Sequence, residues 1–457
     1  MNWSPAQRAT AIVCLMLGGL ALAFRLYYIF SAEPAALLRA DAAQYFRIAI
    51  NVVDHGVYSD AVRGDATPPP DSYRGPGYPT LIAIPWALSQ DVKTTYWAVL
   101  ILQSFLGAGV AVLVFLLSRH WMAEKFALAA ALLVSIWPHL IVQAGCLLTE
   151  SVFGFLLVAA IYLTFRALVS NKAGYGVAAA LIYACAALIN SMIVLFPLFV
   201  FVLILGARGW RPAVLFLMLA LTPPLLWEVR DAEIEPSGGK SAGGRLFENV
   251  LVGLEPDYKP SYRDSKDPKA QEARERMAET SELYNRDKAM AYRSLLTRIS
   301  EHPTEYLAWF LRKPVLLWQW DVAQGAGDIY IYPMVSSPFE RQPLYRIVVS
   351  LCSAINLPLM IAAFCSAALL LLALIRNGVR RQNQAYLLCG GIFLYAVILY
   401  TVLNPDARYA NPFRPFEIVL AFSLIANVAQ RLRKETPDLQ APQATIGTDT
   451  TEASRSS

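Results

Sequence analysis

Residues 40–60 read ADAAQYFRIAINVVDHGVYSD, and residues 68–79 read PPPDSYRGPGYP. Both stretches are polar, yet they follow an apolar segment, 11–30, in a chain that is mostly apolar. Apolar side chains in the first stretch recur at helical spacing, which predicts an amphipathic helix at a membrane surface. The second stretch contains an Arg-Gly-Pro-Gly turn. Together they predict a polar site just outside the first membrane helix.

The composition of the whole chain predicts a polytopic membrane protein. Hydrophobic residues make up 56% of the 457 residues and charged residues only 16%, whereas soluble domains carry about 25% charged residues. The net charge of +5 indicates no nucleic-acid partner, because basic residues at membrane edges account for it. The six cysteines and four histidines show neither a disulfide framework nor metal-ligand spacing, so no metal site is predicted.

Ten apolar runs predict an all-α bundle of about ten spans, because a spanning helix needs about 20 mainly apolar residues. The predicted spans are 10–30, 96–117, 125–143, 147–168, 174–189, 191–206, 211–229, 345–375, 384–403 and 408–429. With a cytoplasmic N-terminus, the basic clusters around Arg119, Lys172, Arg208, Arg376 and Arg431 all fall on the cytoplasmic side. This agrees with the positive-inside rule and supports the count.

This topology places four segments on the outer side. They are 31–95, 145–150, 230–344 and 404–411. The apolar run 306–320 is predicted as a non-crossing or re-entrant helix, since another crossing would move Arg376 outside. Residues 1–430 are predicted as one transmembrane domain and 431–457 as a disordered cytoplasmic tail. The segment 230–344 is expected to be weakly structured apart from a solvated helix over 268–300. The first helix is expected to be uncleaved, with Arg25 as an anchor at the outer interface.

Ionisable side chains in the outer segments are candidates for a functional site. Asp41 is either the cap of the amphipathic helix or a functional carboxylate. Arg74 is either an interface anchor or a bidentate phosphate ligand, and Gly75 beside it lets the backbone approach a ligand closely. Glu150 begins a helix behind Thr149, so it is either part of a cap or a functional acid at membrane depth.

Further candidates are predicted on the same face. They are Glu228, Arg230, Lys313, Asp406 and Arg408, with the aromatic residues Tyr45, Tyr78 and Tyr409. The mixture of acids and bases suits an anionic lipid headgroup together with an acid–base reaction. A channel or carrier is expected to place ionisable groups within its spans, and few occur there in this sequence.

Several short motifs occur in a characteristic order. They are DAAQYFRIA, GVYS, YRGPGYPTLIA, LLTES, WEVR, HPTEYLAWFLRKP and ARYANPFRP. In this order, across residues 20–425, the chain resembles the GT-C membrane glycosyltransferases. Within them it is similar to the protein O-mannosyltransferase and aminoarabinose-transferase type, glycosyltransferase family 39 and its bacterial relatives.

The resemblance implies a GT-C fold and a polyprenyl-phosphate sugar as the donor substrate, with no certain cofactor. It implies transfer to an acceptor hydroxyl, with inversion, at the periplasmic face of a bacterial inner membrane. Asp41 matches the general base, and Glu150 matches a position that orients acceptor or sugar. Positive charge around the leaving phosphate would come from Arg74, Arg230 and Arg408, with Lys313 and Arg25 behind them. The acceptor (protein, lipid or polysaccharide) stays open.

The sequence departs from the family pattern at two places. Ala42 and Ala43 follow Asp41 where many relatives carry a second acid, and the stretch 188–191 lacks an arginine that many relatives have. Two other functions also stay open at this point. One is a flippase or transporter of polyprenyl-linked sugars, and the other is a non-catalytic partner in envelope glycan assembly.

Overall fold

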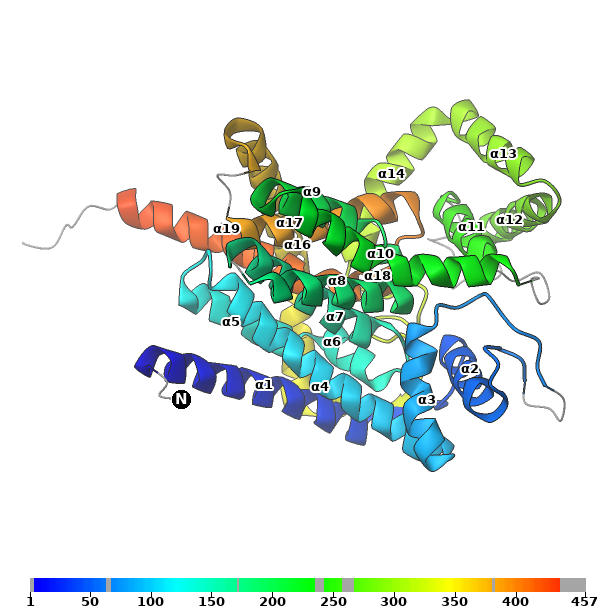
Figure 1. The fold of residues 1–457 in the computed structure, drawn as a ribbon, viewed down its shortest axis with the longest axis horizontal. Helices are drawn as coiled ribbons and strands as arrows, with labels where there is room; N and C mark the ends of the chain where they lie inside the picture. Colours follow the sequence, from blue (N-terminus) through cyan, green and yellow to red (C-terminus); the bar gives the residue numbers. More distant parts are fainter. Residues whose placement is uncertain are drawn as a thin grey trace, which may run out of the picture.

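The computed structural model describes residues 4–62, 67–170, 172–234, 242–256, 267–379 and 383–435. These residues form an elongated bundle of helices (Figure 1). Within them, eight helical segments are long and apolar enough to cross a membrane. They are α1 (Pro5–Ser31), α4 (Val92–Ser118), α7 (Glu150–Val169), Ser191–Arg208 with α9 (Phe196–Arg208), α10 (Trp210–Ala232), α16 (Pro343–Asn377), α17 (Gln384–Val402) and Ala407–Leu432 with α19 (Arg414–Glu435).

Two further predicted spans correspond to a bent pair and a short helix. The predicted span 125–143 is α5 (Glu124–Ile136) followed by α6 (Pro138–Val142) and the 3-10 turn η1 (Gln143–Gly145), with a bend of 51°. A proline that begins α6 explains the break, because proline cannot continue the preceding helix. Including this pair, the bundle has up to nine spans by length and apolarity among the described residues. The predicted span 174–189 is α8 (Ala173–Ile189), a shorter apolar helix of 17 residues.

Although α8 is short, its ends lie at opposite ends of the bundle. Its first residue follows the end of α7, which begins at Glu150. Its last residue, Ile189, lies against Gly77 in the outer segment 31–95. At about 1.5 Å per residue, 17 residues span about 25 Å, near the lower limit for crossing a bilayer. The geometry of α8 therefore agrees with the ten predicted passes along the bundle.

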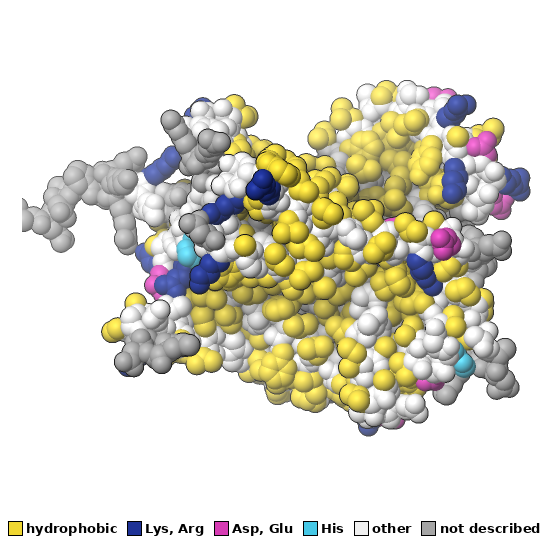
Figure 2. All heavy atoms as spheres, in the orientation of Figure 1, with side chains coloured by type: hydrophobic (Ala, Val, Ile, Leu, Met, Phe, Trp, Pro, Cys, Tyr) yellow, Lys and Arg dark blue, Asp and Glu magenta, His cyan; other side chains and the backbone are white. Residues whose placement is uncertain are grey.

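The bundle has two chemically different ends. Figure 1 shows α2 and α3 at one end, with the N-terminus and the last turns of α19 toward the other. The described basic residues of the predicted cytoplasmic clusters lie in connections or in terminal turns of helices at the N-terminal end, remote from α2. On the face shown in Figure 2, apolar side chains cover the middle, and most charged side chains lie toward the two ends.

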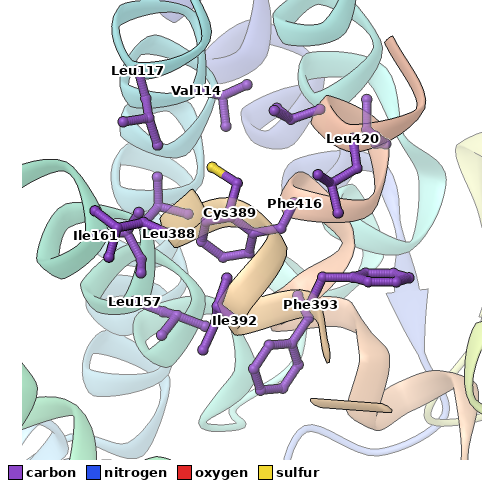
Figure 3. Close-up of a cluster of buried hydrophobic side chains, with 14 of the residues drawn as sticks. Val114, Leu117, Leu157, Ile161, Leu388, Cys389, Ile392, Phe393, Phe416 and Leu420 are labelled. Carbon is purple, nitrogen blue, oxygen red and sulfur yellow. The ribbon is translucent and has the colours of Figure 1, made fainter. Parts of the chain in front are cut away.

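The main core lies where four helices meet. In Figure 3, Leu157 and Ile161 of α7 and Leu388 and Ile392 of α17 point toward one another. Side chains from α4 and α19 complete the cluster, which is almost fully buried. This core therefore holds two helices rigidly: α7, which begins at Glu150, and α17, which ends beside residue 403. This matters because both lead directly into the polar end of the bundle.

The remaining elements lie in or beside the predicted outer segments. They are β1 (Glu33–Pro34), α2 (Asp41–His55), α3 (Gly77–Ser89), η2 (Ser191–Ile193), α11 (Ala242–Gly253), α12 (Pro268–Arg286), α13 (Lys288–Glu301), α14 (Pro303–Trp318), β2 (Met334–Ser336), α15 (Pro338–Arg341), α18 (Ala407–Ala410) and η4 (Asn411–Phe413). β1 and β2 pair antiparallel and join the outer segment 31–95 to the outer segment 230–344. α14 contains the run predicted not to cross, and it is absent from the described helices long and apolar enough to span.

The long segment 230–344 is more ordered than the sequence predicted. Besides the helix predicted over 306–320, which corresponds to α14, its described part contains α11, α12 and α13, where the sequence predicted one solvated helix. Phe247, Leu251 and Leu295 form a small core among them, and Glu255, buried at 1% exposure, pairs with Arg276 at 3.0 Å. Of the four glycines whose composition suggests a flexible entry to this segment, Gly243 and Gly244 lie in α11. Gly238 and Gly239 lie outside the described residues, as do most residues of the predicted tail.

Two groups of charged side chains are buried in the bundle, contrary to the prediction of few ionisable residues there. Arg25 is 1% exposed, and it donates to the carbonyl oxygen of Ser135 at 2.9 Å. A Cβ on Gly107 would lie 2.4 Å from the Nε of Arg25, so the absence of that atom makes the space. The interpretation of Arg25 as an exposed interface anchor is therefore wrong. Arg414 and Glu417, both fully buried, form a second group at 2.7 Å.

Candidate active site

Asp41 begins α2, but it does not act as its cap. The N-cap residue is Ala40, with a φ of 46° and no side-chain hydrogen bond. A positive φ is strained for alanine, and such strain is common at functional sites. The Asp41 carboxylate instead faces two guanidinium groups. Its Oδ1 lies 2.6 Å from Nη2 of Arg74, and its Oδ2 lies 3.0 Å from Nη2 of Arg408.

Arg74 is fixed from several sides by the first outer segment. Its Nε donates to Oε1 of Gln44 at 2.9 Å, and its Nη1 donates to the hydroxyl of Tyr45 at 3.4 Å. The guanidinium carbon lies 5.0 Å from the centre of the Tyr45 ring. The hydroxyl of Tyr58 donates to the carbonyl oxygens of Arg74 and Gly75 at 2.9 and 2.8 Å. Both side chain and backbone are therefore preorganised.

The Arg-Gly-Pro-Gly turn packs against the end of α8. A Cβ on Gly75 would lie 2.7 Å from the carbonyl oxygen of Leu188, and one on Gly77 would lie 2.6 Å from Cγ1 of Ile189. The close approach that these glycines permit is therefore to another helix of the same chain. Residues 188–191, where the sequence lacks the arginine of many relatives, thus lie directly behind the Arg74 turn.

Arg408 joins Asp41 to Glu150. Its Nε donates to Oε1 of Glu150 at 2.5 Å, while its Nη2 contacts Asp41. Asp406 caps α18 by accepting from the Arg408 backbone N–H at 3.0 Å, so it holds the arginine in place. Thr149 makes no cap hydrogen bond to the start of α7. Asp41, Glu150 and Arg408 thus come together from positions that are more than 100 residues apart in the chain.

The carboxylates of Asp41 and Glu150 differ in their exposure to solvent. The Asp41 side chain is 29% exposed, whereas the Glu150 side chain is 5% exposed. Burial raises the pKa of Asp41, but the charges and hydrogen bonds of Arg408 and Arg74 outweigh burial and hold this pKa well below its ordinary value of 3.8. Asp41 is therefore an ionised, accessible carboxylate at neutral pH, and Glu150 is a buried support for Arg408.

A loop after α14 closes one side of the site. Gln324 donates its backbone N–H to Oδ2 of Asp406 at 2.9 Å. The side-chain oxygen of Gln324 accepts from Asn404 at 2.9 Å and from the hydroxyl of Tyr409 at 3.3 Å. The Tyr409 ring stacks on Tyr400 at 5.6 Å. These contacts fix the short α18 that carries Arg408.

The start of this loop is held by the buried Arg414. Arg414 Nη2 donates to the carbonyl oxygens of Trp318 and Gln319 at 3.0 and 2.7 Å. A ring nitrogen of His139 lies 2.7 Å from the next carbonyl oxygen, that of Trp320. The last carbonyls of a helix lack partners within the helix, so these side chains satisfy the end of α14 and direct the chain toward the site.

Four residues predicted for the site lie outside the group formed by Asp41, Arg74, Glu150 and Arg408. Arg230 donates to the carbonyl oxygen of Asp71 at 2.5 Å and stacks on Tyr58 and Trp227. Lys313 donates to three carbonyl oxygens at the end of α17, at 2.8 to 3.2 Å. Two others complete this set: Tyr78 is fully buried with its hydroxyl on Gln103 at 2.8 Å, and Glu228 is exposed on α10.

Three residues of the site were not predicted from the sequence. Gln44 lies one helical turn after Asp41, and this spacing in DAAQ was the available signal. Gln324 gave no signal, because it lies in an irregular loop. Tyr332 also lies in this loop, and burial raises its pKa, an effect that Arg408 opposes and Asp41 adds to. The Tyr332 hydroxyl is buried and has no hydrogen-bond partner among the described residues, so it is a free donor at the site.

Among the described residues, no cluster of three or more His, Cys, Asp or Glu side chains is placed to hold a metal ion. Asp41 and Glu150 are bridged by Arg408. The guanidinium groups of Arg74 and Arg408 place positive charge beside Asp41.

The fold has solved counterparts, although the sequence is distant from them. Neither a protein-family model nor a curated protein sequence matches the chain. The oligosaccharyltransferase of Archaeoglobus fulgidus, solved with a tethered acceptor peptide, has a TM-score of 0.50 at 13% identity, covering 93% of this chain and 50% of its own. ArnT from Cupriavidus metallidurans, bound to undecaprenyl phosphate, has a TM-score of 0.37 at 14% identity, covering 92% and 78%. Arabinosyltransferase EmbB from Mycobacterium smegmatis has a TM-score of 0.36 at 15% identity, covering 94% and 42%.

Of these three likenesses, the one to the oligosaccharyltransferase reaches a TM-score of 0.5. The chain has the fold of a GT-C polytopic membrane protein, as the motifs had implied. It spans about half the length of that archaeal enzyme. At 13% identity, the likeness establishes the fold, and the activity has to be argued from the site.

Proposed function

We propose that this protein transfers a sugar from a polyprenyl-phosphate donor to an acceptor hydroxyl, with inversion, at the periplasmic face of a bacterial inner membrane. One observation carries the proposal. Asp41, an accessible carboxylate, is held between the guanidinium groups of Arg74 and Arg408, at 2.6 and 3.0 Å. This places a proton acceptor next to two groups that bind phosphate oxygens well.

In the proposed reaction, the acceptor oxygen attacks C1 of the sugar while the acceptor proton passes to the Asp41 carboxylate. The bond between C1 and the phosphate oxygen breaks, and its electron pair leaves with the lipid phosphate. Arg408 and Arg74 stabilise the charge that develops on this phosphate, which is the main electrostatic need of such a step. Glu150 keeps Arg408 oriented through the hydrogen bond at 2.5 Å.

The surface beside the site suits the hydrocarbon chain of the donor. Figure 2 shows this face hollowed between α10 and α14, with mainly apolar side chains around the hollow. Exposed residues on α14 include Leu307, Leu311 and Val315, each at least 50% exposed. α14 also packs against α18, which carries Arg408. A lipid chain along this apolar surface would therefore end near the proposed phosphate position.

The decisive variant is Asp41→Asn, which removes the proton acceptor but keeps the size of the side chain. Purified protein would be incubated with a panel of polyprenyl-phosphate sugars and candidate acceptors, and the products identified by mass spectrometry. We expect roughly a 100- to 10,000-fold loss of transfer rate, the range for removal of a general base. Donor lipid should accumulate in cells that carry the variant.

The matched control is Asp60→Asn. Asp60 also pairs with an arginine of α2, since its Oδ1 lies 2.5 Å from Nη2 of Arg47, but that pair does not include Arg74 or Arg408. The control should keep its activity. Equal activity of Asp41→Asn and the unsubstituted chain would exclude Asp41 as the base. Movement of the lipid across vesicles without any sugar transfer would favour a flippase instead.

A further inference from the structure

A cavity lies at the end of the bundle opposite Asp41. Its volume is about 240 Å³, and it lies where the end of α7, the start of α8, the end of α9 and the start of α10 meet. One part of its lining is basic, with Lys172 and Arg208, and another part is apolar, with Leu215, Phe216 and Leu219. The cavity is thus amphipathic, and the reaction proposed above does not use it.

The charge around this cavity is of one sign. Residues 151–227 contain four basic side chains, Arg166, Lys172, Arg208 and Arg211, and no aspartate or glutamate. Lys172 and Arg211 are exposed, and neither makes an ion pair with a described residue. The described carboxylate at the start of α5, Glu124, already lies 3.9 Å from Arg119. Positive charge therefore remains uncompensated at the mouth.

The two remaining basic groups are held in place by neutral partners. Arg208 donates to the carbonyl oxygens of Ala167 and Leu168 at 3.2 and 3.0 Å, at the end of α7. Arg166 donates to the hydroxyls of Tyr162 and Tyr175 at 3.0 and 2.9 Å. These neutral acceptors hold the two guanidinium groups in place at the end of the bundle that contains the cavity.

Aromatic side chains place the cavity at the level of lipid headgroups. Trp210 is 64% exposed at the start of α10, with Arg211 lying 5.5 Å from its ring. Tryptophan and tyrosine concentrate at membrane–water interfaces. Leu215, one turn further along α10, is 49% exposed, so the apolar wall of the cavity continues onto the lipid-facing surface.

We propose that this cavity is a binding site for an anionic phospholipid. The headgroup phosphate lies between Lys172 and Arg211, and one acyl chain follows α10 past Leu215. Basic pockets between membrane helices bind anionic headgroups by this combination of charge and shape. The site is independent of the proposed transfer reaction, and it would hold for the Asp41→Asn variant as well.

Native mass spectrometry of the delipidated full chain in detergent tests this proposal. Phosphatidylglycerol and phosphatidylethanolamine with identical acyl chains would be titrated separately. We expect one phosphatidylglycerol to be retained and phosphatidylethanolamine to be bound much more weakly. The double variant Lys172→Gln/Arg211→Gln should lower the affinity for phosphatidylglycerol roughly 10- to 30-fold, since each basic side chain near a surface contributes about tenfold or less.

The matched control, Arg8→Gln/Arg376→Gln, removes two exposed basic side chains from the same end of the bundle, away from the cavity. It should leave the affinity unchanged. Gly176→Leu keeps every charge but fills the cavity, and its Cβ fits because the nearest atom lies 4.0 Å away. It should also lower the affinity. Equal losses in the two double variants, equal binding of the two lipids, or displacement by inorganic phosphate alone would each overturn the proposal.

Discussion

At the scale of single residues, the position of Asp41 between Arg74 and Arg408 has a chemical cost. The two arginines stabilise the carboxylate and hold its pKa well below 3.8, which makes Asp41 a weak base in the empty site. A donor phosphate that binds these guanidinium groups would draw them away from Asp41. The pKa of Asp41 would then rise, because burial alone favours the protonated form. In the proposed reaction, donor binding thus activates the base.

The pH dependence of kcat/KM should report this arrangement, because it follows ionisations of the free enzyme. In the unsubstituted chain, Asp41 stays ionised as pH falls to 3.8, so no acid limb from this group appears above that value. Arg74→Gln removes one positive charge but leaves the partial burial that raises the pKa of Asp41. We therefore expect the acid limb of the remaining activity to move to higher pH. Transfer rates between pH 4 and 8 measure the shift.

Arg47→Gln is the control for this prediction. It removes a guanidinium group from the same helix, but one that pairs with Asp60. Its acid limb should match that of the unsubstituted chain. The same displacement in both variants would mean that general surface charge, rather than the contact between Arg74 and Asp41, sets the pKa.

The charged side chains of the site were easier to predict from the sequence than the residues that surround them. Asp41, Arg74, Glu150 and Arg408 were all predicted, and the structure brings them together through direct contacts. The hydroxyl of Tyr332 was missed, because its position depends on how an irregular loop folds across the bundle. Periodicity carries no information about such a loop.

At the scale of elements, the turn that carries Arg74 depends on the end of α8. Gly75→Ala would place a Cβ 2.7 Å from the carbonyl oxygen of Leu188, and overpacking of this kind costs about 1–3 kcal/mol. We expect a lower melting temperature and a larger fractional loss of transfer activity, because Arg74 is the adjacent residue. Thermal unfolding in detergent and initial rates measure the two effects.

Gly206→Ala is the matched control within α9. Nothing lies within 4 Å of a Cβ at Gly206, and alanine is favoured over glycine inside a helix by about 1 kcal/mol. This variant should be as stable as the unsubstituted chain or more so, with unchanged activity. A Gly75→Ala protein that kept full stability and full activity would show that α8 yields to the added atom.

The elements were predictable where hydrophobic periodicity dominates. Each of the ten predicted spans corresponds to a helix or bent pair in the structure, and the amphipathic α2 lies where its spacing placed it. The helices of 230–344 were underestimated, because a small core around Phe247 and the buried Glu255 stabilises them. Such a core involves residues that are distant in sequence, so local patterns do not indicate it.

At the scale of the whole molecule, the two ends of the bundle differ in the chemistry that they can support. One end gathers Asp41, Glu150 and Arg408, which come from the starts of α2, α7 and α18. The other end gathers basic connections around the cavity beside Lys172. Between the two ends, the buried Arg414 pairs with Glu417 of its own helix at 2.7 Å and donates to carbonyl oxygens at the end of α14. Breaking such a pair by removing one partner costs about 3–5 kcal/mol, so these contacts favour a single arrangement of the bundle.

This polarity predicts which side of the membrane each end faces. Introduced cysteines at Lys93 and Arg286 should react with a membrane-impermeant maleimide in intact cells, whereas cysteines at Lys125 and Arg376 should react only after lysis. All four positions are exposed, and the unsubstituted chain gives the background from its own six cysteines. The positive-inside rule supplies the sign of the prediction.

The decisive comparison is between Arg286 and Arg376, because α14 and α16 separate them. If only α16 crosses, the two positions react from opposite sides, but if α14 also crosses, they react from the same side, and the topology proposed for this site is wrong.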